Sequence, residues 1–251
     1  MSFEPNTLGI KVYAPARMDD ESRFVAAVHG LERVLPGLRL DWTVTDEHQL
    51  IPILSRDEWI ARTRRDGGIP FVCNNDETHP VMMSVLGISA DSGPGGQPLL
   101  DIHAKLPLST PVVAAAATLL EAVAEGAQAL WGHATPFNAS AEIAQQTFHP
   151  HMPRPPPRGL PALKRSWEIH SPAIPHRLGW LNFWSAEAAR SIGFPDLSRD
   201  AELLSRSRRT TTGGWVVPLT ETPLDLDKPA HLDALLRAYE RFPEIGGRST
   251  P

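Results

Sequence analysis

The feature that most restricts the fold is a proline-rich stretch in the middle of the chain, HPHMPRPPPRGLP at residues 149–161. Its six prolines fix φ and remove backbone donors, so it cannot join a helix or a central strand. It therefore predicts an extended crossover between two lobes, residues 1–148 and 162–251. The second lobe has too few strand patterns for a sheet of its own, so we expect a single domain over residues 1–251 in which these strands extend the sheet of the first lobe.

The periodicity of apolar residues predicts both strands and helices, in mixed order and without an internal repeat. This order is typical of an α+β fold, and we expect a mixed, mainly antiparallel sheet with helices packed on it. Strands are expected at 8–14, 38–45, 69–75, 80–89, 98–106, 177–184 and 213–220. Helices are expected within 19–35, 55–65, 109–131, 138–148, 185–193, 199–210 and 228–242.

Charge and cysteine content exclude several classes of function. A formal net charge of −5 argues against a nucleic-acid partner, which needs a basic face. The single cysteine, Cys73, excludes an intramolecular disulfide and any site with several thiolate ligands. The first residues have no signal-peptide pattern, and no apolar window of about 18 residues occurs. We therefore expect a cytoplasmic protein with no membrane partner.

The most suggestive chemical pattern is the strand LLDIHAKL, residues 99–106. Asp101, His103 and Lys105 alternate along it and must share one face. Restriction-endonuclease-like enzymes use an acid-x-Lys strand to hold a metal, so a metal-dependent enzyme that uses this face is one alternative. Its other interpretation is the solvent-facing side of a half-buried strand.

Other candidate motifs are weaker. The His149–x–His151 pair, with His170 and His176 nearby, lacks the spacing and the rigid elements of a zinc site. The loop GPGGQP, residues 93–98, lacks the Lys-Ser/Thr ending of a phosphate-binding loop. We accordingly expect no catalytic residue, no metal and no cofactor. A further alternative is a non-catalytic regulatory module whose proline-rich segment is a ligand for another domain.

Two segments of the second lobe are candidates for protein binding. Four carboxylates, those of Glu221, Asp225, Asp227 and Asp233, lie close together before and within the last helix pattern. They either favour the helix dipole or form an acidic face for a basic protein partner. The run RLGWLNFW, residues 177–184, is apolar on both faces and is typical of a central strand. Trp215 follows a glycine pair in GGWVV, and we expect this segment to lie beside 177–184.

These two segments carry a resemblance to known families. GWLNFWS…IGFP together with GGWVVPLTETPLD resembles a myxobacterial family of uncharacterised proteins, over nearly the whole chain. More distantly, the chain resembles the immunity-protein family numbered fifty-two of polymorphic toxin systems. That family has a Gly-Gly pair followed by a phenylalanine slightly later than Trp215 stands here.

The resemblance implies an α+β protein without catalysis that binds and silences a cognate toxin carrying a restriction-endonuclease-like nuclease domain. The substrate face of a nuclease is basic, so the acidic segment is expected to take part in binding. The candidate partner-binding residues are Glu221, Asp225, Asp227, Asp233 and Trp215.

Overall fold

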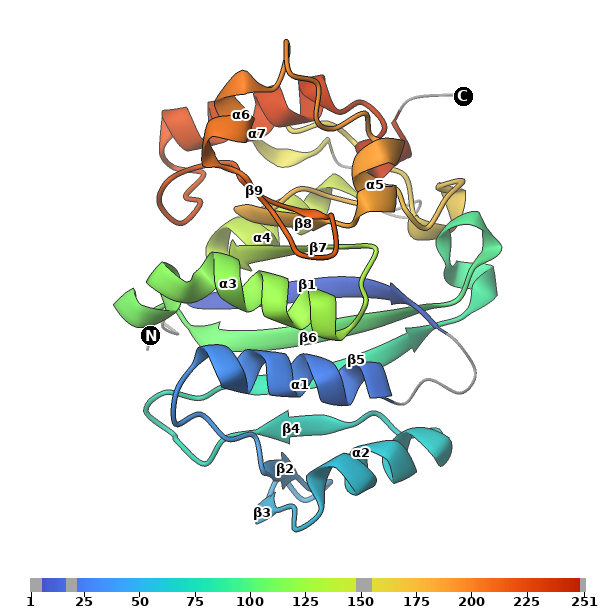
Figure 1. Cartoon of the computed structure of the whole chain (residues 1–251), viewed down its shortest axis with the longest axis vertical. Helices are drawn as coiled ribbons and strands as arrows, with labels where there is room; N and C mark the ends of the chain where they lie inside the picture. Colours follow the sequence, from blue (N-terminus) through green and yellow to red (C-terminus); the bar gives the residue numbers. More distant parts are fainter. Residues whose placement is uncertain (1–5, 17–21, 148–154, 249–251) are drawn as a thin grey trace.

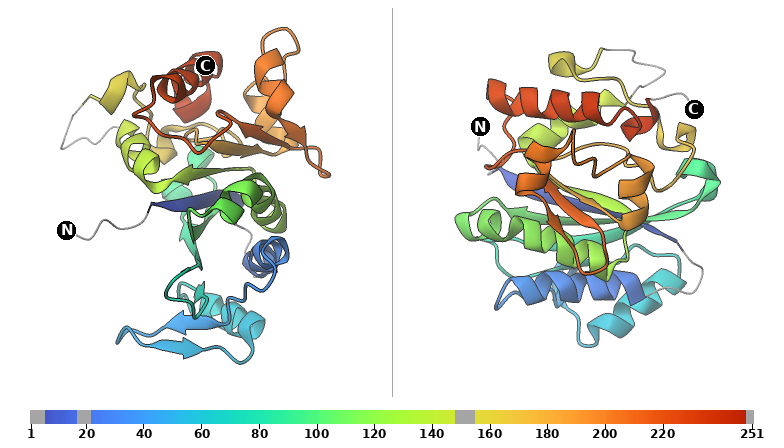
Figure 2. Two further views of the ribbon diagram at one scale, coloured as in Figure 1. Left: turned by 90° about the vertical axis from the view of Figure 1, so that its left-hand side faces the viewer. Right: turned by 45° about the horizontal axis from the view of Figure 1, so that its top comes forward.

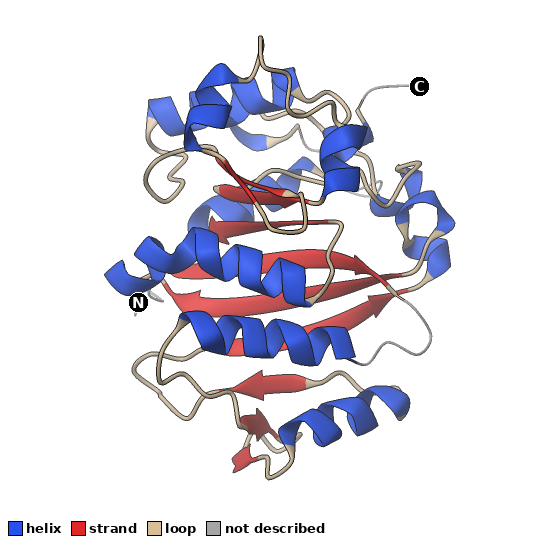
Figure 3. Ribbon diagram, viewed as in Figure 1, coloured by secondary structure: helices blue, strands red, loops and turns tan. Residues whose placement is uncertain are grey.

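The computed structural model describes residues 6–16, 22–147 and 155–248. Its ten strands form one sheet in the order β3-β2-β4-β5-β6-β1-β7-β8-β10-β9, with every neighbouring pair antiparallel. Helices pack on this sheet, so the chain has the expected α+β fold (Figures 1 and 3). The strands are β1 (Thr7–Pro15), β2 (Trp42–Val44), β3 (Leu50–Pro52), β4 (Phe71–Cys73), β5 (Met82–Ile88), β6 (Leu99–Pro107), β7 (Trp131–Pro136), β8 (Leu181–Trp184), β9 (Arg208–Arg209) and β10 (Trp215–Pro218). The helices are α1 (Ser22–Val34), α2 (Arg56–Arg65), α3 (Thr110–Gly126), α4 (Phe137–Ile143), α5 (Ala186–Ser191), α6 (Ala201–Arg206) and α7 (Pro229–Arg241).

Strand β1 lies at the centre of the sheet and explains how the core forms. Its burial alternates strictly, with Leu8, Ile10, Val12 and Ala14 fully buried on one face. The facing residues of β6 follow the same alternation, so β1 and β6 present one continuous apolar surface. Helices α1 and α3 cover that surface, and α2 extends the helical layer toward β2 and β3 (Figures 1 and 2). The part of the core formed by the first half of the chain therefore lies between this layer and one face of the sheet, and a second part, with Trp184 and Phe242, lies on the other face.

Two glycines allow α1 and α3 to approach each other closely. A Cβ added to Gly30 would lie 2.5 Å from the carbonyl oxygen of Ala122, and one added to Gly126 would lie 2.6 Å from that of Ala26. Real Cβ atoms do not approach an oxygen so closely. The two helices are thus in backbone contact at reciprocal positions, and only glycine fits at either one.

The second half of the chain extends the sheet, as its sparse strand pattern predicted. Strand β8 pairs with β7 on one side and β10 on the other, and all four of its residues are buried. Trp215 lies directly opposite Trp184, which confirms that the two aromatic segments are neighbours. Residues 148–154 of the proline-rich segment lie outside the described residues. The remainder, 155–161, contains only a short 3₁₀ turn, Pro157–Gly159, as expected for an irregular connection.

Candidate functional site

A row of polar side chains crosses the sheet on the face opposite α1 and α3. Directly opposed residues of adjacent strands have Cβ atoms about 5 Å apart, so they form a continuous line of contacts. The register confirms that Asp101, His103 and Lys105 share this face. The row runs over β5, β6, β1, β7 and β8 through Ser84, His103, Lys11, His133 and Asn182.

Asp101 is partnered within this face by Tyr13, the residue opposite it on β1. The tyrosine hydroxyl donates a hydrogen bond to the carboxyl group. Burial raises the pKa of Asp101, while Lys11 and Arg177 pull it down. Burial and the neighbouring carboxylate also raise the pKa of Tyr13. The carboxylate is therefore held by a local partner, although its Oδ1 atom is buried without a hydrogen bond.

The histidines of the row are neutral at pH 7. Burial, together with the charges of Lys11 and Lys105, lowers the pKa of His103 to about 4. His133 is buried, and its pKa falls well below the ordinary value because of burial and the charges of Arg177 and Lys11. A general base works best when its pKa lies near the working pH, so an imidazole with a pKa of about 4 is a weak base. The row has the geometry of a site but not the proton affinities of an acid–base pair.

Among the residues that the structure describes, no three His, Cys, Asp or Glu side chains come together in a way that could hold a metal ion. His149 and His151 lie outside those residues. His176 is engaged elsewhere, because its Nε2–H donates to the carbonyl of Lys164 at 2.8 Å. Cys73 is buried in β4, and burial raises the pKa of its thiol, which lowers the thiolate fraction that reacts or binds metals.

The acidic segment, residues 221–233, lies beside a groove of about 470 Å³ at the end of the sheet where β1 begins and β6 and β7 end. Asp225 and Asp227 line this groove, opposite Asn6 and Leu108. Glu221 and Asp233 lie outside the groove lining, and both side chains are exposed. The four predicted carboxylates therefore lie on one stretch of chain, but only two of them face the groove.

Cations of the same chain pair with three of the four carboxylates. Arg158 donates to Asp227 Oδ1 at 2.7 Å and to Glu142 Oε1 at 2.9 Å. Lys228 lies 3.8 Å from Asp225, and Arg237 pairs with Asp233 one turn away on α7. The pairing partially neutralises the segment and joins it to the proline-rich connection, from which Arg158 comes. No local pattern indicated the role of Arg158, because the residues it joins are far apart in the chain.

Trp215 is half-buried at the edge of an aromatic cluster. Its ring contacts Phe194 edge-on at 5.3 Å, and Phe194 in turn meets Trp184 at 5.0 Å. Trp184 and Phe242 are also in edge contact, at 5.2 Å. Such edge-to-face pairs are favoured by the ring quadrupoles. Trp215 therefore contributes to the core with one side and keeps part of its surface accessible.

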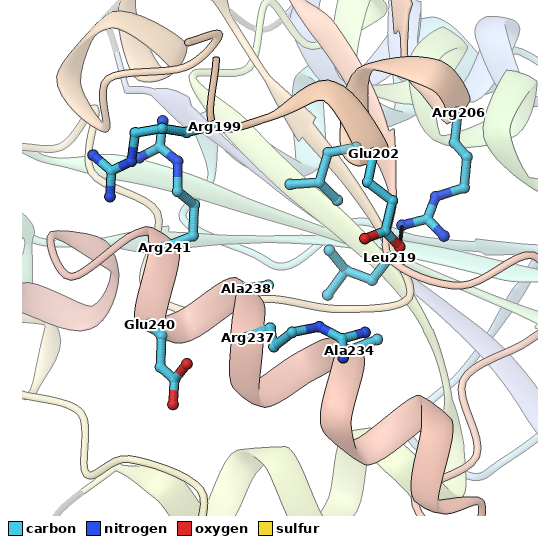
Figure 4. Close-up of a pocket in the computed structure, with 10 residues that line it drawn as sticks. Arg199, Glu202, Arg206, Leu219, Ala234, Arg237, Ala238, Glu240 and Arg241 are labelled. Atoms are coloured by element: carbon cyan, nitrogen blue, oxygen red, sulfur yellow. Dashed lines mark hydrogen bonds and ion pairs between the residues drawn. The ribbon is translucent and has the colours of Figure 1, made fainter. Parts of the chain in front are cut away.

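A second groove, of about 500 Å³, lies between α6 and α7 and is rich in arginine (Figure 4). Most of its cations are already paired. Arg241 holds the fully buried carboxylate of Asp200 through two bonds, at 2.6 and 2.9 Å, and Arg206 lies 3.4 Å from Glu202. These pairs make the groove a structural junction between the two helices more than a site for a free anion.

The fold defines a class, an α+β protein built on one antiparallel sheet. The chain belongs to the family described as Domain of unknown function (DUF5953), whose match spans residues 19–250. Its fold is similar to that of the Pseudomonas aeruginosa T6SS protein PA0821, with a TM-score of 0.56 at 14% sequence identity, over 94% of this chain and 73% of that chain. Comparison with curated proteins gives no match. No helix of the described residues is long and apolar enough to cross a membrane.

The sequence analysis identified the β6 residues of the polar row, Asp101, His103 and Lys105, but not those that the neighbouring strands contribute. Lys11 and Tyr13 alternate on β1, which carried a local signal of a polar face, whereas β7, which holds His133 and Thr135, was not predicted as a strand. Their assembly into one row needs the strand order, which no local pattern contains.

Proposed function

We propose that this protein is an immunity protein that binds a cognate toxin with a restriction-endonuclease-like nuclease domain and neutralises it stoichiometrically, without catalysis of its own. The observation that carries the proposal is the similarity of almost the entire chain to a T6SS protein. A cell that delivers a toxin through such a system needs an inhibitor for its own protection. The resemblance of the two aromatic segments to an immunity family supports the same function. A nuclease acts on nucleic acid in the cytoplasm, so the inhibitor is proposed to act there.

The acidic segment is the proposed contact for the basic substrate face of the toxin. Its thirteen residues carry four carboxylates and one lysine, and Glu221 and Asp227 are exposed. Trp215 is included in the contact as a partially accessible aromatic anchor, a residue type that is enriched at binding hot spots. Charged groups at such a contact act mainly by speeding association and selecting the partner.

The test is co-purification and growth rescue with the toxin encoded in the neighbouring reading frame. The wild-type chain is expected to form a 1:1 complex and to restore growth. The double variant Glu221→Lys/Asp225→Lys is expected to weaken binding by about tenfold or more at low salt, and less at high salt. Glu187→Lys, which reverses an exposed charge on α5, is the matched control and should bind as the wild type does. Absence of any complex with the wild-type chain would refute the proposal, and unchanged binding by the double variant would remove the acidic segment from it.

A further inference from the structure

One face of the sheet is open over β2 and β3 and only partially open over β4, β5 and β6. Figure 2 (left) shows α1, α2 and α3 on one side of these strands, and none of the described α-helices lies against β4 and β5 on the other. The strand register assigns residues to this second side, because directly opposed residues share a face. We call it the open face; its members include Val44, Leu50, Phe71, Met82, Leu86 and Lys105.

Most apolar strand residues are more exposed on the open face than on the covered one; Cys73 of the open face, 7% exposed, and Ile51 of the covered face, 40% exposed, are exceptions. On the covered face, Val72 and Met83 are fully buried and Val85 is 1% exposed. On the open face, Val44 is 43% exposed, Leu50 38% and Leu86 46%. Val44 and Leu50 are directly opposed, so they form one apolar unit on the β2–β3 hairpin. Neighbouring apolar side chains that remain exposed on a sheet mark an interaction surface.

Two lysines lie along the β6–β1 border of the open face, although the whole chain carries −5. Lys105 lies opposite Met82, and Lys11 lies opposite His103 in the adjoining row. Within the described part of the chain, neither lysine forms an ion pair. Asp101, the carboxylate nearest to them in the row, is hydrogen-bonded to Tyr13. The face therefore combines exposed apolar side chains on β2, β3 and β5 with two lysines at its β6–β1 border.

From this combination we infer that the open face is a docking surface for an apolar protein patch bordered by carboxylates, presented by the same toxin. The inference rests on the proposed function. Leu108, three residues beyond Lys105, lines the groove of the acidic segment, so the two surfaces of opposite charge adjoin. A partner that meets both must present a basic region beside an acidic one. Such a pattern fixes its orientation and rejects partners of a single charge.

The experiment compares variants of the open face with a matched control by titration against the purified toxin. Val44→Asp/Leu86→Asp places negative charge among the exposed apolar side chains of the open face. Lys105→Glu reverses the charge at its β6 border. Leu197→Asp introduces the same charge at an 81% exposed leucine in the turn after α5. All four positions are solvent-accessible, and thermal melting verifies that each variant folds. We expect the double variant to raise Kd at least 100-fold, Lys105→Glu to raise it about tenfold at low salt, and Leu197→Asp to leave it unchanged.

The outcomes separate this inference from the proposed function. If the wild type binds the toxin and the open-face variants bind equally well, the open face is not the docking surface, and the proposed function stands. If the wild type forms no complex, both fail. Sedimentation of the wild type alone distinguishes a second copy of the chain: a dimer that Val44→Asp/Leu86→Asp dissociates would overturn the assignment to the toxin.

Discussion

Acidification from pH 7 to pH 5 is expected to destabilise this fold, because the buried His133 and the half-buried His103 and His176 resist protonation in the folded state. Burial and neighbouring cations lower the pKa of both His103 and His176 from 6.5 to about 4. Between these two values the unfolded chain binds more protons than the folded chain, so stability rises with pH. The contribution of these neutral histidines to the free energy of unfolding is therefore fully present above pH 6.5 and is lost progressively as the pH falls toward 4.

The size of the effect follows from the linkage relation. One pKa unit corresponds to about 1.4 kcal/mol, and His103 and His176 each lose about 2 kcal/mol of unfolding free energy between pH 7 and pH 5. The two together give about 4 kcal/mol, an upper value because both rings keep some contact with solvent. This range lies above the titration of ordinary carboxyl groups, so acidic residues contribute little to the change.

The assay is urea unfolding at pH 7, 6 and 5, at constant ionic strength. His103→Gln/His176→Gln removes two of these titrating groups while keeping polar side chains, and it is expected to lose their share of the pH dependence, whereas the share of the buried His133 remains. His79→Gln is the matched control, because the side chain of His79 is 67% exposed. If the wild type and the double variant lost stability in parallel from pH 7 to pH 5, the assignment of the effect to His103 and His176 would be wrong.

Two further predictions concern one contact within each half of the chain. Asp200→Asn is expected to lower the free energy of unfolding by about 3 kcal/mol, because it leaves Arg241 without the counter-charge of a fully buried carboxylate. Urea unfolding measures this loss, and a loss under 1 kcal/mol would show that the ion pair is dispensable. Gly30→Ala is expected to lower the free energy of unfolding by about 1–3 kcal/mol, because the added methyl group forces α1 away from α3. Gly87→Ala serves as the control, because no atom lies within 4 Å of its added Cβ. Equal melting temperatures for these two glycine variants would contradict the close helix contact.

Several elements of the fold were predictable because their signals are local. The alternation at 8–14 predicted β1, and the capped, apolar pattern at 109–131 predicted α3. The two-faced apolar run at 177–184 predicted a buried central strand, which β8 is, although the strand begins only at Leu181. Strands β3, β7 and β9 were missed. Strands β3 and β9 have three and two residues, too few for a periodic pattern to emerge. All six residues of β7 are buried, so no alternation marks it, and its first residue was assigned to the end of the preceding helix.

The candidate surfaces were predictable only in part. Alternation alone placed Asp101, His103 and Lys105 on one face, and composition alone marked the acidic segment. The pairing of Asp227 with Arg158 joins residues 69 positions apart, and sequence spacing carries no information on such a contact. The open face was not predictable either, because exposure of Val44 and Leu86 depends on which side of the sheet the helices cover.

The sequence by itself determined where most strands and helices lie, and which side chains of those strands share a face. These properties follow from backbone geometry and from a repeat of two or 3.6 residues, both of which act over a few positions. Only the tertiary structure decided the order of the strands, the row of polar side chains across five of them, and the face that remains uncovered. Strand pairing joins segments distant in the chain, and its free energy comes from burying side chains that no local pattern brings together.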